Sequence, residues 1–223
     1  MARIYVETLI RADLDEVWRH TKDPGRHARW DLRFTHIEHV TAERFRYRTT
    51  LLPGVHIDGF GVTAGELDRP DGSALSVLRF GSGDRRSLIA RGGGYWRYVP
   101  VTGGVRFLTA YDYRPRWGRA GRLADRAFRP TFGWATAWSF DRLRLWLEDG
   151  VSPSTSRWCW LAETTIRTGL VLAAWRFGPV PLVAALGLPP TRWTPAARRC
   201  LRHPVVRRSR PASRPADRKA GPE

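Results

Sequence analysis

The sequence predicts an α+β domain in which a curved, seven-stranded antiparallel sheet is closed by one long C-terminal helix. Three observations lead to this prediction. Residues 3–114 contain seven stretches with strand periodicity, and turn-like sequences separate most of them. Residues 119–149 have helical periodicity, enough for a helix of about 45 Å. A curved sheet must bury its concave face, and this helix is the only large element predicted before residue 150.

The first predicted elements are a strand and two short helices. Residues 3–10 alternate between two faces, which is typical of a strand. A helix is expected to begin at Asp13, and Asp23-Pro24 starts a second helix over residues 25–29.

Six further strands are expected, and they cover residues 34–40, 44–52, 55–66, 74–80, 86–98 and 104–114. The sequences between them are rich in Gly, Pro and Asp, which favours short turns and an antiparallel meander. Several glycines fall inside the strands, and we expect them to form bulges that bend the sheet: Gly59, Gly61, Gly92, Gly93 and Gly94.

The long helix carries apolar side chains on two sides. At about 100° per residue, one stripe is expected to face the sheet: Ala120, Leu123, Ala124, Ala127, Trp134, Trp138 and Leu145. A second group lies opposite it: Phe132, Phe140, Leu143, Trp146 and Leu147. Pro130 cannot donate a hydrogen bond to the carbonyl of Arg126, so we expect a bend there. The apolar chain at 158–188 is the nearest candidate to cover the second group.

The opening of the chain carries a family pattern. After the first strand come four short motifs, Ala12-Asp13, Val17-Trp18, Asp23-Pro24 and Trp30. This order resembles the START-like, Bet v 1-like superfamily (SRPBCC), which includes polyketide cyclases and lipid-transfer proteins; Asp13 stands where that family usually has proline. The resemblance covers residues 3–149. It implies a helix-grip fold, in which a curved antiparallel sheet grips the C-terminal helix around a cavity.

Aromatic side chains, several with hydroxyl groups, lie on single faces of two predicted strands. Such side chains stack and form hydrogen bonds, which suits a flat, partly oxygenated ligand. The alternative is that they belong only to the core. The residues expected to line the cavity are Tyr47, Trp96, Phe107, Tyr111, Trp134 and Trp138.

The positive charge is spread unevenly. The net charge is +17, of which +7 belongs to residues 1–150 and +10 to residues 151–223. Nearly all of the basic residues are scattered arginines, which favours codon bias in a GC-rich genome over a nucleic-acid surface. No nucleic-acid partner is expected.

Cysteine and histidine usage argues against metal chemistry. Cys159 and Cys200 are expected to be free thiols in a reducing cytosol. His36 and His39 would point to opposite faces of a strand, so neither a metal nor another cofactor is expected. The first ten residues are too short and polar for a signal peptide.

His56 and Asp58 are the best candidates for acid–base catalysis. At i and i+2 on a strand they share a face, and a carboxylate near an imidazole raises the pKa of the imidazole. The alternative is a solvated outer face of the sheet. No Gly-x-Ser-x-Gly motif is present.

The C-terminal extension is apolar and then basic. Between Gly169 and Leu188 the only charge is Arg176, and Gly178-Pro179 predicts a turn between two short apolar segments. These segments could dock on the domain or lie on a membrane surface, with the following arginines at the lipid headgroups. The predicted divisions are a helix-grip domain at 1–150, the extension at 151–204 and a disordered tail at 205–223.

The leading functional hypothesis is a cytoplasmic protein that binds a hydrophobic small molecule, aromatic, polyketide-like or lipid-like, between the sheet and the long helix. One alternative is a polyketide-type aromatic cyclase or dehydratase, with His56, Asp58, Tyr47 or Tyr111 as acid–base groups. Another is a membrane-peripheral interaction module that uses 158–188 and the Arg-rich tail.

Overall fold

The computed structural model describes residues 3–204 and has the predicted order of elements. These are β1 (Ile4–Ile10), α1 (Leu14–Lys22), α2 (Pro24–Trp30), β2 (His36–His39), β3 (Arg44–Leu52), β4 (Val55–Asp68), β5 (Ala74–Gly81), β6 (Ile89–Val101), β7 (Gly104–Pro115), α3 (Gly118–Asp149), α4 (Pro153–Phe177), α5 (Val180–Gly187) and a short 3₁₀ turn η1 (Ala197–Arg199). The predicted tail at 205–223 lies outside the described residues.

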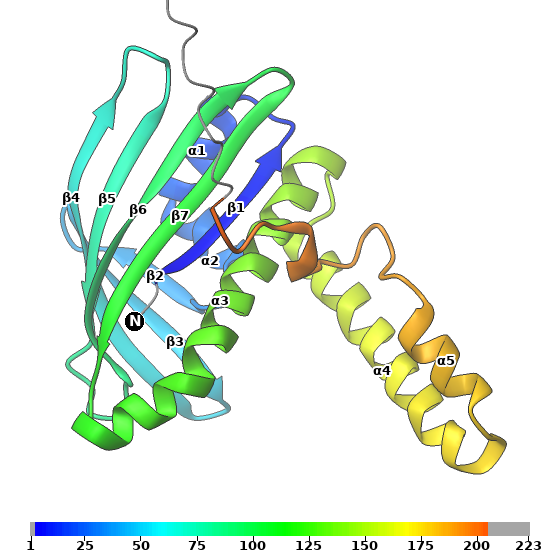
Figure 1. Cartoon of the computed structure of the whole chain (residues 1–223). Coiled ribbons are helices and arrows are strands. Elements are labelled where there is room, and N and C mark those ends of the chain that lie inside the picture. The colour runs from blue at the N-terminus through cyan, green and yellow to red at the C-terminus, as the bar shows by residue number, and fades with distance from the viewer. Residues whose placement is uncertain (1–2, 205–223) are drawn as a thin grey trace, which may run out of the picture.

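The seven strands form one antiparallel sheet in the order β1-β7-β6-β5-β4-β3-β2. The sheet curves, and α3 crosses its open side next to β1, while α1 and α2 lie on the same side (Figure 1). The predicted α+β class, the seven antiparallel strands and the closing helix are therefore confirmed.

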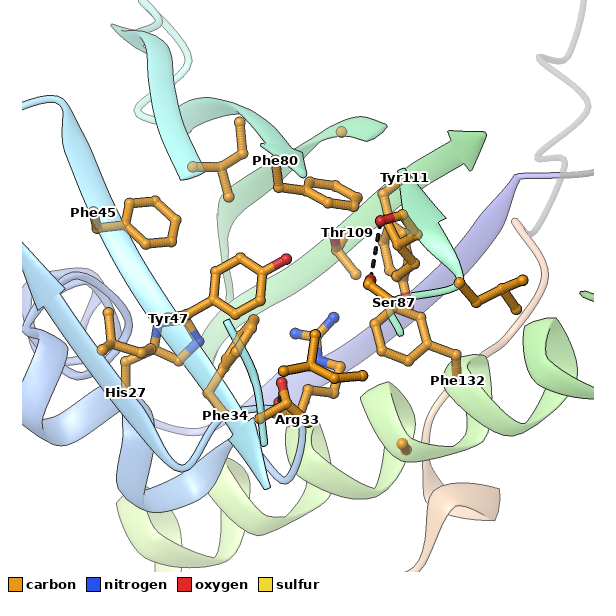
Figure 2. Close-up of a pocket in the computed structure, with 18 of the residues that line it drawn as sticks. His27, Arg33, Phe34, Phe45, Tyr47, Phe80, Ser87, Thr109, Tyr111 and Phe132 are labelled. Atoms are coloured by element: carbon orange, nitrogen blue, oxygen red, sulfur yellow. Dashed lines mark hydrogen bonds between the residues drawn. The ribbon is translucent and has the colours of Figure 1, made fainter. Parts of the chain in front are cut away.

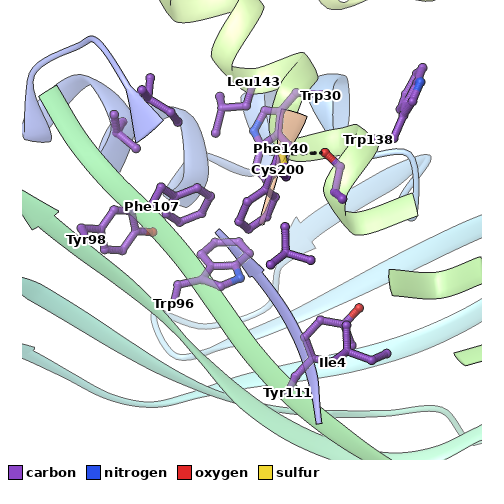
Figure 3. Packing of buried hydrophobic residues seen from close by; sticks show 14 of the residues in the cluster. Ile4, Trp30, Trp96, Tyr98, Phe107, Tyr111, Trp138, Phe140, Leu143 and Cys200 are labelled. Carbon is purple, nitrogen blue, oxygen red and sulfur yellow. Dashed lines mark hydrogen bonds between the residues drawn. The ribbon is translucent and has the colours of Figure 1, made fainter. Parts of the chain in front are cut away.

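The core is an aromatic stack between the sheet and the helices. Phe107 of β7 stacks on Phe140 of α3 with ring centroids 4.5 Å apart, and on Tyr98 of β6 at 5.0 Å (Figure 3). Trp30, at the end of α2, meets Phe140 edge-on at 6.1 Å and donates its Nε1–H to the carbonyl of His20 at 2.9 Å. Large aromatic rings bury much apolar surface, so this stack fixes α2 and α3 on the sheet.

The sheet-facing side of α3 differs from the prediction. Phe140 and Leu143, expected on the uncovered side, are fully buried, whereas Leu123 and Trp134 of the expected sheet-facing stripe are 65% and 37% exposed. At these positions the prediction was wrong, because α3 has two apolar sides and periodicity alone cannot say which one meets the sheet. Ala124 and Ala127 of the predicted stripe do lie on the side towards the sheet.

The two short helices, and not the extension, cover the C-terminal half of the second apolar group. The ring of Trp146 meets that of His20 of α1 at 4.6 Å, and the guanidinium of Arg29 of α2 lies 4.7 Å from the centre of the same indole. On the other side of α3, Trp138 meets Trp160 of α4 with ring centroids 5.8 Å apart. The extension thus covers part of the stripe that was expected to face the sheet.

The strand glycines serve a different purpose from the one expected. The register shifts of the sheet lie between Thr50 and Leu52, between Thr63 and Gly65, and between Ile89 and Arg91, so the expected bulges at residues 59, 61 and 92–94 are wrong. Four of these five glycines instead pair across strands with aromatic residues: Gly61 with Phe45, Gly59 with Tyr47, Gly92 with Phe80, and Gly94 with Tyr111.

At two of these positions the missing Cβ leaves room for a ring. A Cβ on Gly59 would lie 2.2 Å from Cζ of Tyr47, and one on Gly61 would lie 2.1 Å from Cζ of Phe45. Both rings therefore lie over the neighbouring strand, which leaves open space on the concave side of the sheet.

Helix α3 continues through Pro130 as one element, and it curves along the sheet (Figure 1). The helix does not break at this proline. The extension then forms a helical hairpin whose turn lies at Gly178-Pro179, as predicted, although α4 is longer than the short segment expected. Only the base of the hairpin packs on the domain; the rest projects away from it (Figure 1).

Candidate functional site

A cavity of about 700 Å³ lies between the concave face of the sheet and the N-terminal half of α3. Its walls are mostly apolar. The larger apolar side chains that line it are Phe34, Ile37, Phe45, Ile57, Leu78, Phe80, Leu88, Ile89, Trp96, Trp117, Phe128 and Phe132, and the small residues Ala124, Ala127 and Ala135 of α3 form its helical side. A space of this size and polarity is typical of small-molecule sites.

A buried ion pair forms one wall of the cavity. Arg33, in the connection between α2 and β2, donates from Nε to Oδ1 of Asp31 at 2.9 Å and from Nη2 to Oδ2 at 2.6 Å. Nε2 of His27 lies 3.1 Å from Oδ2 of the same carboxylate. The side chain of Asp31 is fully buried, and His27 and Arg33 both line the cavity. The Asp31 carboxylate thus fixes the orientation of two polar cavity residues.

The charges of this cluster follow from burial and pairing. Burial opposes the charge of Asp31, but the Arg33 guanidinium outweighs it and holds the pKa of Asp31 well below its usual range. Burial likewise opposes the charge of Arg33, and the Asp31 carboxylate outweighs it, so the pKa of Arg33 is raised. Burial lowers the pKa of His27, so its imidazole is neutral at pH 7. The cluster is an ion pair with a neutral imidazole beside it.

Aromatic rings surround the Arg33 guanidinium. Its Cζ lies 5.4 Å from the ring centre of Phe34, 5.6 Å from that of Phe132 and 5.8 Å from that of Tyr111. Figure 2 shows the guanidinium among these rings, with Tyr47 on the same side of the cavity. Such contacts stabilise a cation in an apolar wall.

The tyrosines supply hydroxyl groups to the cavity. The Tyr111 hydroxyl shares a hydrogen bond with Oγ1 of Thr136 at 2.6 Å, and the Tyr47 hydroxyl donates to the carbonyl of Gly81 at 3.3 Å. Burial raises the pKa of Tyr47 to about 12, and it also raises the pKa of Tyr111. Both are therefore neutral hydrogen-bonding groups at pH 7.

Three of the six predicted ligand-binding residues line the cavity: Tyr47, Trp96 and Tyr111. Phe107 is fully buried behind it in the core stack. Trp138 is buried against Trp160 of the extension, and Trp134 is partly exposed on the side of α3 turned away from the sheet.

His56 and Asp58 do not face the cavity. They flank Ile57, which lines it, and successive strand residues point to opposite faces. Asp58 is exposed and pairs with Arg48 of β3, whose Nε lies 2.7 Å from Oδ1, and this hydrogen bond lowers the pKa of Asp58. The pair lies on the outer face of the sheet.

Arg33, Asp31 and His27 were not predicted as residues of the site. The spacing of His27 and Asp31, four residues apart across the end of α2, was the available signal. Arg33 gave no signal, because its contacts with Tyr111 and Phe132 join distant parts of the chain.

Two findings concern metal binding and membrane spanning. Within residues 3–204, no group of three or more His, Cys, Asp or Glu side chains is placed to hold a metal ion. None of the helices described is both long enough and apolar enough to cross a membrane.

Comparison with known proteins gives one related sequence and many similar folds. No family model matches the chain. Over 157 residues it is 43% identical to YndG, an uncharacterized membrane protein of Bacillus subtilis (strain 168). The match covers 67% of this chain and 59% of that protein, so the chain spans little more than half of its relative's length.

Two solved structures illustrate the likeness of fold. A conserved protein from Geobacillus kaustophilus has a TM-score of 0.50 at 10% identity, over 66% of this chain and 96% of that chain. A STAR-related lipid transfer protein fragment from Xanthomonas axonopodis has a TM-score of 0.49 at 19% identity, over 64% of this chain and 84% of that chain. At such identities the likeness concerns the fold alone. With its curved sheet, its crossing helix and the cavity between them, the chain has the helix-grip fold that the family resemblance of its opening motifs implies.

Proposed function

We propose that this protein binds a hydrophobic small molecule, aromatic, polyketide-like or lipid-like, in the cavity beneath α3. The observation that carries the proposal is an apolar cavity of about 700 Å³ with a buried arginine in its wall. Binding would remove apolar ligand surface from water, at roughly 25 cal/mol per Å² buried.

The N–H groups of Arg33 that do not bind Asp31 indicate which kind of ligand group would bind beside it. A guanidinium has five N–H groups, and Asp31 accepts from only two of them. The guanidinium carbon lies 5.8 Å from the centre of the Tyr111 ring, and its remaining N–H groups favour a ligand oxygen, such as a carbonyl or hydroxyl. Because Asp31 already balances the charge of Arg33, the ligand oxygen does not need a charge of its own to meet the guanidinium.

A fluorescent fatty-acid analogue tests the binding proposal on the full chain. Ala135→Phe would fill the cavity from α3, so saturable binding of the probe should fall at least about tenfold. Ala120→Phe is the matched control, because Ala120 is an exposed residue of the same helix that does not line the cavity. Native mass spectrometry of the purified protein should also detect an apolar adduct. Absence of both adduct and saturable binding would overturn the proposal.

The second candidate function is a polyketide-type aromatic cyclase or dehydratase. The observation that favours it is the His27–Asp31 pair on the cavity wall, where a carboxylate orients a neutral imidazole that could accept a proton. If turnover of a poly-β-keto chain is detected, His27→Gln should slow it about 100-fold or more, whereas His56→Gln should not. Equal rates in the two variants would exclude this role for His27.

The third candidate is peripheral membrane contact through residues 158–188, on the cytoplasmic side. Two observations favour it: large apolar side chains of the hairpin are exposed, and the related Bacillus sequence is named a membrane protein. Of the arginines that were expected to assist, those after residue 204 lie outside the described residues. Co-sedimentation of the full chain with phosphatidylcholine–phosphatidylglycerol vesicles tests the contact, and a protein that stays wholly in the supernatant would rule it out.

A further inference from the structure

Both ends of the extension are fastened to the helix-grip domain. At the start of α4, Nε of Arg142 donates to the carbonyl of Pro153 at 2.9 Å. After α5, the buried Asp141 accepts from the backbone N–H of Ala196 at 2.8 Å. Leu201 then pairs with Glu7 of β1 through two backbone hydrogen bonds of 2.9 Å. The hairpin between these anchors is therefore held in place, projecting from the domain (Figure 1).

A polar cluster closes the base of the hairpin. Arg167 of α4 pairs with Glu163 at 2.7 Å and donates from Nη2 to the carbonyl of Leu188 at 2.7 Å, just after α5. Glu163 also accepts from the backbone N–H of Thr191 at 3.2 Å. Beyond this cluster, towards the tip, the hairpin carries only one charge, that of Arg176.

The tip of the hairpin, which we define as residues 171–186, exposes apolar side chains on several sides. Trp175 is 98% exposed, and Leu172, Phe177, Val180, Val183 and Leu186 are each between 69% and 76% exposed. At about 100° per residue, Leu172 and Trp175 share one side of α4, whereas Phe177 is about 200° from Trp175 and points to the opposite side. A protein partner normally covers one face of a helix, whereas an apolar medium covers all faces at once.

The backbone of the tip is suited to an apolar medium. The first N–H groups of a helix have no partner within it, but Pro179 and Pro181 carry no N–H, so the start of α5 has fewer unpaired donors. The N–H of Gly178 donates to Ala174, and that of Val183 donates to Pro179. Fewer unsatisfied groups lower the cost of placing this turn among lipid chains.

The length and charge of the hairpin limit how it can meet a bilayer. The eight residues of α5 rise about 12 Å, far less than the roughly 30 Å of a bilayer's hydrocarbon core. Arg176 must keep its guanidinium near the phosphates, so its side chain limits the depth of the tip. Arg192, next to Thr191 of the base cluster, is exposed and has no acidic partner within the described chain, so its charge favours an anionic bilayer.

We propose that the hairpin tip dips into one leaflet of an anionic bilayer, with Arg176 at the headgroups. This inference rests on the proposed membrane contact and adds how the contact is made: the tip enters the acyl region, and the base of the hairpin and the domain remain outside it. A second copy of the chain is the competing occupant.

The test places an environment-sensitive fluorophore (NBD) on the full chain in a Cys159→Ser background, because Cys200 is buried. Val180→Cys carries the label at the tip and Pro189→Cys carries it at the base. With phosphatidylcholine–phosphatidylglycerol vesicles, the tip label should shift to the blue and be quenched by lipids brominated on their acyl chains, and the base label should not. Trp175→Glu should weaken vesicle partitioning about tenfold or more, whereas Leu123→Glu, at an exposed apolar residue of α3, should not.

The outcomes separate the two proposals. Vesicle binding without quenching at the tip would overturn the insertion and leave peripheral contact standing. No vesicle binding would overturn both. A tip label already shielded in vesicle-free solution, in a protein that sediments as a dimer, would assign the surface to a second copy and overturn the insertion.

Discussion

The Arg33 guanidinium and the Asp31 carboxylate meet through two hydrogen bonds, of 2.9 Å and 2.6 Å, in the wall of a mostly apolar cavity. The two residues lie just after α2, whose Trp30 is locked in the core, so the core also fixes the ion pair. A buried pair of this kind contributes little net stability, but removing one partner leaves the other charge uncompensated.

Loss of the carboxylate charge should therefore destabilise the fold strongly. Asp31→Asn should lower the free energy of unfolding by about 3–5 kcal/mol, because the Arg33 guanidinium stays buried without a counter-ion. Urea denaturation measures the loss. Asp84→Asn is the control, since the Asp84–Arg86 pair at 2.8 Å has an exposed guanidinium, and its loss should be far smaller. Equal losses would show that burial of the Asp31–Arg33 pair has no energetic consequence.

His27 should make stability depend on pH. Burial lowers its pKa below the ordinary value of 6.5, so the unfolded chain takes up a proton first as the pH falls. The contribution of the neutral His27 to the free energy of unfolding is complete above about pH 6.5. It is lost as the pH falls below that value, and the free energy of unfolding then decreases by up to about 1.4 kcal/mol per pH unit. Urea denaturation between pH 7.5 and 5.5 (about one unit either side) should show this slope, and His27→Gln should remove it.

The matched control is His36→Gln, because His36 is exposed on β2. It should keep the slope of the parent protein. If the slope persists in His27→Gln and disappears in His36→Gln, the pH dependence comes from His36 and the prediction for His27 is wrong.

The fold could be predicted from sequence because it depends on local patterns. Strand alternation, turn sequences and the motif series ending at Trp30 each belong to a short stretch of chain, and together they indicated the sheet and its closing helix. The orientation of α3 could not be predicted in this way. It depends on Phe140 meeting Phe107 and Trp30, which are distant in sequence, and a helix with two apolar sides offers no local signal to choose between them.

The cavity residues on the strands could be predicted from sequence, whereas those on α3 and in the connection after α2 could not. Strand alternation placed Tyr47 and Tyr111 on the concave face, where they line the cavity. Trp134 and Trp138 were misplaced together with the face of α3 that carries them. Arg33 lies outside any helix or strand, so periodicity says nothing about it, and only the folded chain brings it to Tyr111 and Phe132.

Gly59 should control the volume of the cavity through Tyr47. In Gly59→Ala the new Cβ would lie 2.2 Å from Cζ of Tyr47, so the ring must swing off the neighbouring strand towards the cavity. Saturable binding of the fatty-acid analogue should weaken about tenfold, with little change in stability because a side chain can move. Gly65→Ala should have no effect on binding, since nothing lies within 4 Å of its added Cβ.

Gly94 provides the contrasting case. There a Cβ would meet the carbonyl oxygen of Ala110 at 2.6 Å and Cα of Tyr111 at 2.8 Å, and backbone atoms cannot move aside cheaply. Gly94→Ala should therefore lower the urea midpoint markedly. If Gly59→Ala is the less stable of the two variants, the Tyr47 ring does not move aside as expected, and the prediction for Gly59 is wrong.

Asp141 should hold the end of the extension on the domain. Its buried carboxylate accepts from the N–H of Ala196 at 2.8 Å and from Nη1 of Arg199 at 3.0 Å. This segment covers Cys200, whose Sγ donates to the carbonyl of Ala137 at 3.2 Å, and burial raises the pKa of the thiol to about 12.

Alkylation of Cys200 measures how often this segment opens. In a Cys159→Ser background, alkylation of Cys200 at pH 7.5 (about neutral) should be slow, because few thiols are ionised or accessible. Asp141→Asn removes the charge that both donors need, so the segment should open more often and alkylation should accelerate about tenfold or more. Asp149→Asn, at the exposed end of the same helix, should leave the rate unchanged. A rate that does not respond to Asp141→Asn would mean that the pairing of Leu201 with Glu7 is sufficient to anchor the extension.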